Sequence, residues 1–125
     1  MPEFIHKDLS RYYLILFWLA LFGLMVVSSI PSVPVNTKIE THALSFRLDY
    51  LLHFVAYTVI AFLFGKAYFP SFMGFILLAR FALLEEGHQL LIPGRTFNPV
   101  DLGFDLLGIA VVTGVWWMVR KANPK

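Results

Sequence analysis

The sequence contains no cysteine and few charged residues. Without cysteine the chain has no disulfide, no thiolate nucleophile and no cysteine-ligated metal. Asp, Glu, Lys and Arg together make up only 14% of its 125 residues, whereas apolar residues make up 58%. A soluble domain of this composition could not cover its surface with polar side chains, so an ordinary soluble fold is excluded.

The chain also lacks a basic surface pattern and a recognisable metal-binding motif. The net charge is only +2, and the basic residues flank the apolar stretches instead of forming a continuous face. We therefore expect no nucleic-acid partner. No H-E-x-x-H or comparable spacing of metal ligands occurs, so the sequence leaves a metal, or any other cofactor, unknown.

Four mostly apolar stretches occupy most of the chain, at about residues 12–30, 49–68, 71–92 and 99–119. Each is close to the roughly 20 residues that an α-helix needs to cross about 30 Å of hydrocarbon. We therefore predict an all-α integral membrane bundle of four transmembrane helices, built as one membrane domain over residues 1–125. The connections after the second and third stretches are short, which predicts that the last three helices pack as antiparallel neighbours.

The first stretch has a competing interpretation as a secretory signal peptide, because the small residues Ser28 and Ser29 end it. Its apolar part exceeds the roughly 7 to 15 residues of a signal peptide, which favours a retained helix. Residues 31–47 are polar and are predicted to form the long loop of the chain. Asp49 follows as a candidate N-cap of the second helix.

Lys and Arg are unevenly distributed between the two sides of the predicted bundle. The loops and ends on the side of the termini carry six of these residues and the other side carries three, with Arg80 left inside the third stretch. The positive-inside rule therefore predicts that the N- and C-termini are both cytoplasmic. The sequence does not decide whether Arg80 snorkels toward the interface or pairs with an acid.

Polar residues gather at the predicted outer ends of the last three helices. Their spacing is four residues in the second and fourth helices and three in the third, so each helix presents them on one face. All of them should reach a similar depth near the outer leaflet. The candidate binding residues are Asp49, His53, Tyr57, Glu86, Gln89, Arg95, Asp101 and Asp105.

Taken singly, these residues have structural interpretations, such as capping or an interior hydrogen bond. Taken together, they are costly to place in lipid, because a carboxylate at the centre of a helix costs roughly 2.5 to 3.5 kcal/mol. They should face one another, a cavity or water. Arg95 could pair with Glu86, Asp101 and Asp105 to fix the outer loop, or it could hold a phosphate, sulfate or carboxylate. His53 and the acids could move protons or bind a divalent cation.

The order and spacing of these residues resemble the VanZ-like family of bacterial membrane proteins. The matching segments are D-Y-L-L-H-F-V-A-Y at 49–57, E-G-H-Q at 86–89 and P-G-R at 93–95, followed by Asp101, a polar residue at 105 and Gly108. The resemblance covers about residues 45–115. Tyr50 stands where the family tends to have Lys, and Asp105 stands where Asn is usual.

The resemblance implies a location and a biological setting but no reaction. It implies that Glu86, not Glu85, is the inward-facing acid, and that the protein is a multi-pass protein of the bacterial or archaeal cytoplasmic (inner) membrane. It also implies a role in the cell envelope, with a relation to glycopeptide-antibiotic tolerance in some members. No catalytic assignment comes with the motif.

Three functional hypotheses follow. The first is a non-enzymatic envelope protein that binds or modulates a cell-surface lipid, a lipid-linked precursor or a partner through the outer polar residues. The second is a membrane-embedded enzyme on a lipid-linked phosphate or sugar, with His53 as general acid or base, Arg95 holding the anion, and Glu86 or Asp101 orienting His53. The third is a proton- or cation-coupled transporter or a subunit of one. The gathering of polar groups at one face argues against this third hypothesis. The lipid bilayer is a partner in all three, and a homodimer stays an open alternative.

Overall fold

The computed structural model describes residues 3–30, 39–68, 71–95 and 97–123, with the backbone alone for residues 3–8 and 39–49. These residues form helices and connecting turns without a strand, so the all-α prediction is confirmed. The elements are α1 (Glu3–Ser28), α2 (Ile39–Ala67), α3 (Phe72–His88), the short 3-10 helix η1 (Gln89–Leu91) and α4 (Pro99–Ala122).

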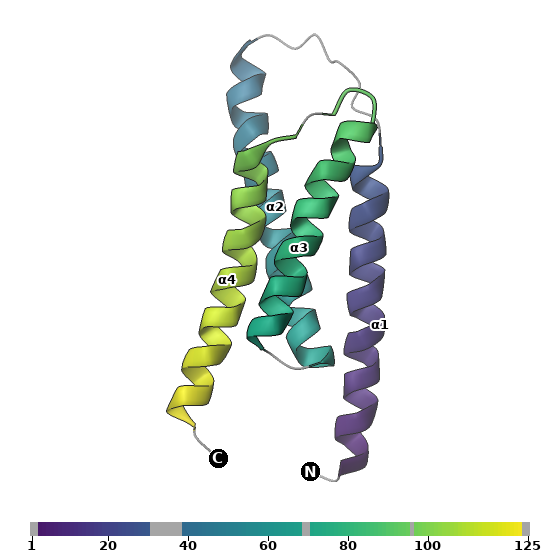
Figure 1. Cartoon of the computed structure of the whole chain (residues 1–125), viewed down its shortest axis with the longest axis vertical. Coiled ribbons are helices and arrows are strands. Elements are labelled where there is room, and N and C mark those ends of the chain that lie inside the picture. The colour runs from purple at the N-terminus through teal and green to yellow at the C-terminus, as the bar shows by residue number, and fades with distance from the viewer. Residues whose placement is uncertain (1–2, 31–38, 69–70, 96, 124–125) are drawn as a thin grey trace.

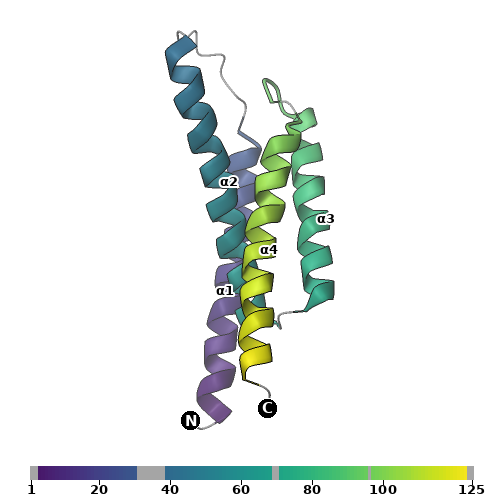
Figure 2. The ribbon, with the colours of Figure 1, turned by 90° about the vertical axis from the view of Figure 1, so that its left-hand side faces the viewer.

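The four α-helices lie side by side and alternate in direction along the chain (Figures 1 and 2). Helices α1 and α3 run away from the end at which the chain begins, and α2 and α4 run back toward it. Glu3 and Ala122 therefore lie at the same end of the bundle (Figure 1). We refer to this end as the terminal end, and to the opposite end, where η1 connects α3 to α4, as the loop end.

Three of the described helices are long and apolar enough to cross a membrane, in the stretches Leu9–Ser28, Tyr50–Ala67 and Pro99–Ala122. The third predicted span, residues 71–92, is not among them, because its α-helix ends at His88 after 17 residues. At 1.5 Å per residue this helix is about 25 Å long, shorter than the roughly 30 Å hydrocarbon core. Three of the four predicted membrane spans are therefore supported by length and composition, whereas the α-helix of α3 alone is too short for this criterion.

The second helix begins earlier than predicted. Residues 31–47 were expected to form a loop, but α2 is already helical from Ile39. No Pro or Gly interrupts residues 39–48, and Glu40, Ala43 and Leu44 are good helix formers, so nothing in this segment stops the helix. Asp49 consequently lies inside α2, and its predicted role as N-cap is wrong.

The most extensive helix contact is between α2 and α4, which run parallel, whereas α2 and α3 touch little. The prediction that α2, α3 and α4 pack as consecutive antiparallel neighbours is therefore wrong for α2 with α3.

Two glycines allow the close contact between α2 and α4. A Cβ atom at Gly108 would lie 2.7 Å from the carbonyl oxygen of Phe54 and 2.9 Å from Oγ1 of Thr58, and one at Gly65 would collide with the ring of Trp116. Small residues at such crossings let two backbones approach closely.

Aromatic rings join α1 to α2 toward the terminal end. Phe17 is buried and makes edge-to-face contacts with Trp18, Phe64 and Tyr68, at ring-centroid distances of 5.4, 5.5 and 5.9 Å respectively. The indole N–H of Trp18 donates to the hydroxyl of Tyr68 at 3.2 Å. We refer to these four residues as the aromatic cluster. It fixes α1 to the rest of the bundle through packing and one hydrogen bond.

Candidate functional site

Seven polar side chains from α2, α3, η1 and α4 meet at the loop end of the bundle. We refer to them as the carboxylate cluster; its members are His53, Tyr57, Glu85, Glu86, Gln89, Asp101 and Asp105. All of them are buried except His53, which is partly buried. Buried polar groups of this kind need hydrogen-bond partners. A polar group without a partner in lipid or in the protein interior costs roughly several kcal/mol.

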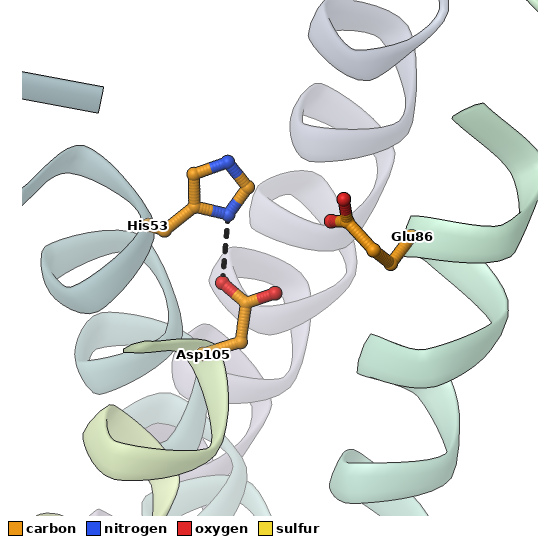
Figure 3. A group of neighbouring side chains, drawn as sticks. All are labelled: His53, Glu86 and Asp105. Carbon is orange, nitrogen blue, oxygen red and sulfur yellow. Dashed lines mark hydrogen bonds and ion pairs between the residues drawn. The ribbon is translucent and has the colours of Figure 1, made fainter. Parts of the chain in front are cut away.

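His53 joins α2 to α4 through two aspartates. Its Nδ1 atom lies 2.8 Å from Oδ1 of Asp105, which is fully buried (Figure 3), and its Nε2 atom lies 3.7 Å from Oδ2 of Asp101. Asp101 and Asp105 are one helical turn apart, so both face the imidazole from the same side of α4. The two carboxylates together hold the ring in place. The close passage of the backbones at Gly108, one turn further along α4, brings the two helices within this reach.

Glu85 is also part of the cluster, although the family resemblance selected Glu86 as the inward acid. Glu85 is only 1% exposed, and its two oxygens accept hydrogen bonds from the hydroxyl of Tyr57 and the amide of Gln89, both at 3.1 Å. The prediction that Glu86 alone points inward is therefore wrong. One signal in the sequence could have found Glu85: it lies four residues before Gln89, and helical geometry places such pairs on one face.

Glu86 connects α3 to the start of α4. One of its carboxylate oxygens accepts a hydrogen bond from the backbone N–H of Asn98 at 3.0 Å, and the other accepts from the Gln89 amide at 3.4 Å. Asn98 is itself the N-cap of α4, and its side-chain oxygen accepts from the N–H of Val100. Glu86 thus sits at the positive end of the α4 dipole, which favours a carboxylate there.

Arg95 points toward α1 and does not pair with any acid whose side chain the structure describes. Its Nε and one Nη atom donate to the carbonyl oxygens of Ile30 and Val27, at 3.2 and 3.4 Å, at the C-terminal end of α1. The predicted network of Arg95 with Glu86, Asp101 and Asp105 is therefore not formed among the described residues. The turn at Gly94, with φ of 77°, carries the chain into this position.

Two further predicted residues are placed differently. The side chain of Asp49 lies outside the described residues, although its backbone belongs to α2. Arg80 is exposed on α3, and within the described part of the chain it makes no ion pair with an acid. Of the eight predicted binding residues, the structure brings six into one cluster and turns Arg95 toward α1.

A cavity of about 470 Å³ opens beside the carboxylate cluster, between α1, α2 and α3. Its polar lining comes from Ser28, His53, Glu85, Gln89 and Arg95. Its apolar lining comes from Ala20, Gly23, Leu24, Val27, Leu52, Ala56, Val59 and Ile60. A space of this size with apolar walls and a few polar groups has the character of a small-molecule site.

Comparisons with protein-family models, with curated protein sequences and with solved structures give no match to this chain.

Proposed function

We propose that the chain is a VanZ-like envelope protein of the bacterial cytoplasmic (inner) membrane, which binds a lipid or lipid-linked envelope precursor with an anionic headgroup. The cavity between α1, α2 and α3 is the observation that carries this proposal, because apolar and polar walls meet in it. An acyl or polyprenyl chain matches the apolar wall, and a phosphate or sugar headgroup matches the polar one. Altered tolerance of glycopeptide antibiotics is the phenotype that the family resemblance adds.

Arg95 is the residue proposed to hold the anion. Its two contacts with the α1 carbonyls use part of a guanidinium group that has five N–H donors in all. The remaining donors are available to a phosphate oxygen at the mouth of the cavity, and charge-assisted bonds of this type are the stronger ones. The anchoring to Val27 and Ile30 lowers the conformational entropy that Arg95 loses on binding.

The proposed placement in the membrane has both termini in the cytoplasm and the loop end at the outer surface. The distribution of Lys and Arg supports this orientation. In this placement α3 acts as the fourth spanning element together with η1, whose three residues at about 2 Å each extend the helix toward 30 Å. The loop end then meets the headgroups of the outer leaflet.

The first test is retention of lipid by the purified protein. Native mass spectrometry of protein extracted in mild detergent should show one bound phosphate-bearing lipid per chain, and Arg95→Ala should lose it. Arg80→Ala is the matched control, because Arg80 is an exposed arginine on the adjacent helix. Equal retention by the wild type and by Arg95→Ala would contradict the role of Arg95.

A second test fills the cavity. Gly23 lines it, and a Cβ atom there would meet no other atom within 4 Å, so Gly23→Leu should fold and occupy the space meant for the lipid. Gly103→Leu is the control, since a Cβ at exposed Gly103 also meets nothing but lies on α4 outside the cavity. Lipid retention should fall only in Gly23→Leu. Unchanged retention in both variants would overturn the proposal that this cavity is the binding site.

The enzymatic alternative keeps one specific observation in its favour. His53 lines the cavity and is oriented by Asp105 at 2.8 Å, an arrangement that suits a general acid or base. Release of phosphate or sugar from polyprenyl-phosphate substrates by the purified protein, abolished in His53→Gln, would favour this alternative. Binding without turnover of any of these substrates would leave the binding protein as the better account.

A further inference from the structure

Three side chains of the carboxylate cluster each present a ligand atom to one common point. His53 comes from α2, Glu86 from α3 and Asp105 from α4, and one nitrogen or oxygen of each lies within 4.8 Å of the others (Figure 3). Glu86 and Asp105 are fully buried. The three helices therefore converge on a small polar space that the spacing of the sequence alone does not reveal.

An unsatisfied atom faces this space. Oδ2 of Asp105 is buried and has no hydrogen-bond partner among the described residues, while Oδ1 of the same carboxylate contacts His53. Figure 3 shows the free oxygen on the side of Asp105 that faces Glu86. A buried carboxylate oxygen without a partner is costly, and a bound cation would satisfy it.

The described contacts of the two acids leave their charge poorly compensated. Within the described residues, Glu86 and Asp105 are approached by an amide, a backbone N–H and the imidazole, and by no Lys or Arg side chain. Glu85, also buried, adds a third carboxylate that is bonded only by a hydroxyl and an amide. A dication placed between His53, Glu86 and Asp105 would offset this negative charge.

The donor set narrows the class of cation. One imidazole nitrogen and two carboxylate oxygens suit Zn²⁺ and similar first-row dications better than the all-oxygen preference of Ca²⁺ or Mg²⁺. Tetrahedral Zn²⁺ with bonds near 2.0 to 2.1 Å places its ligand atoms about 3.3 Å apart. The ligand atoms of the set lie within 4.8 Å of one another, so side-chain rotation can bring them to this spacing. Binding of the ion to Nδ1 of His53 would replace the 2.8 Å hydrogen bond that Nδ1 makes with Oδ1 of Asp105.

Neighbouring residues form the outer contacts that metal ligands usually have. If Nδ1 of His53 holds the ion, its Nε2 atom faces Asp101 at 3.7 Å, which resembles the carboxylate–histidine–metal arrangement of zinc proteins. The N–H of Asn98 holds one oxygen of Glu86 at 3.0 Å and leaves the other on the side of the Gln89 amide. Asp101 and Asn98 would thus orient the ligands without touching the ion.

We propose that His53, Glu86 and Asp105 form a binding site for Zn²⁺ or a similar divalent transition-metal ion. Three protein ligands leave at least one position open, and His53 also lines the cavity, so a phosphate-bearing headgroup could complete the coordination. The coordination of the ion by a lipid headgroup rests on the proposed function. The metal site itself does not require a lipid.

Zn²⁺ alone is the probe for the metal site. Protein purified in detergent with a tag that contains no histidine, stripped with EDTA and passed through lipid-removing washes, should bind one Zn²⁺ per chain in isothermal titration calorimetry. His53→Gln and Asp105→Asn should each weaken binding by more than about tenfold, and Asp101→Asn, a positioning residue, by about tenfold. His88→Gln is the matched control and should bind as the wild type does. Absence of Zn²⁺ binding, or an equal loss in His88→Gln, would overturn the proposal.

A spectroscopic measurement on the wild type covers the case in which a variant fails to fold. Co²⁺ added to the stripped protein should give the intense visible absorption of a four- or five-coordinate ion, and Zn²⁺ should displace it. A spectrum equal to that of Co²⁺ in buffer would contradict the site.

The metal and lipid results separate the two proposals. Zn²⁺ binding together with an absence of lipid retention would support the metal site and contradict the proposed lipid-binding function. Lipid retention that is unchanged by EDTA, in protein that takes up no Zn²⁺, would contradict the metal site and support the lipid-binding function.

Discussion

The two ends of the bundle are held together by different kinds of interaction. At the terminal end, the aromatic cluster packs Phe17 of α1 against Phe64 of α2 and Tyr68, which follows α2. At the loop end, buried carboxylates are bonded by His53, Tyr57 and Gln89 across three helices. Lipid chains can replace much of an apolar contact, whereas only protein, water or a ligand can satisfy a buried carboxylate. The terminal end is therefore held by apolar packing, and the loop end carries the polar groups of the proposed binding site.

The largest expected effect comes from separating α2 and α4, on which both ends depend. Gly108→Val places atoms against the carbonyl oxygen of Phe54, which is backbone and cannot move aside. The free energy of unfolding should fall by about 3 kcal/mol, the upper part of the range for overpacking. Unfolding in SDS followed by circular dichroism measures it. Gly103→Val, where a Cβ meets nothing, should change little, and an equal loss in both variants would contradict the close crossing at Gly108.

A truncation in the aromatic cluster should affect stability and leave binding intact. Phe17→Ala removes a buried ring with three aromatic neighbours. The expected loss is about 2 kcal/mol, below the roughly 3 to 5 kcal/mol of soluble cores, because an acyl chain can enter the space. The folded fraction should retain lipid and Zn²⁺ as the wild type does. Loss of ligand binding in folded Phe17→Ala would contradict the proposal that the aromatic cluster contributes to stability and not to binding.

A hydroxyl deletion at the loop end should have a smaller effect on stability. Tyr57→Phe removes the hydrogen bond to Glu85 and leaves one buried carboxylate oxygen without that donor. We expect a loss of about 1 kcal/mol, since a carboxylate left unsatisfied costs more than an average membrane hydrogen bond. A double-mutant cycle with Glu85→Gln isolates the coupling between the two residues. Strictly additive effects of the two substitutions would show that this hydrogen bond contributes nothing.

The smallest effect is expected for the hydrogen bond at the terminal end. Trp18→Phe deletes the donor to Tyr68, and both side chains are exposed. The loss should be about 0.6 kcal/mol, the average for hydrogen bonds between transmembrane helices. The same SDS unfolding measurement allows a direct comparison with Tyr57→Phe. A larger loss in Trp18→Phe than in Tyr57→Phe would reverse the expected ranking of the two hydrogen bonds.

Much of the fold and of the candidate site was predictable from the sequence, because the length of apolar stretches and the helical spacing of residues are local properties. They gave the all-α class, three of the four spans and the convergence of polar residues on α2, α3 and α4. The early end of α3 at His88 was not predictable in this way, since hydropathy does not distinguish an α-helix from the 3-10 turn of Gln89–Leu91. The helical residues 39–47 were missed because their polarity indicates only that they avoid lipid.

The errors in the site arise from contacts between distant segments. Whether Arg95 faces acids or the end of α1 depends on how α1 packs, and no spacing along the chain reports this. Glu85 can be buried because Tyr57 and Gln89 donate hydrogen bonds to its carboxylate, and these contacts form only in the assembled bundle. The parallel contact of α2 with α4 likewise depends on Gly108 meeting Phe54, more than 50 positions apart in sequence.

The most direct test of the division between the two ends is nuclear magnetic resonance of ¹⁵N-labelled protein titrated with short-chain phosphatidic acid. The side-chain signals of Gln89 and Arg95 report on the loop end, and the indole signal of Trp18 reports on the terminal end. We predict saturable shifts of Gln89 and Arg95 with one site per chain, while Trp18 stays unchanged. Equal shifts at both ends, or none at Gln89 and Arg95, would contradict the account.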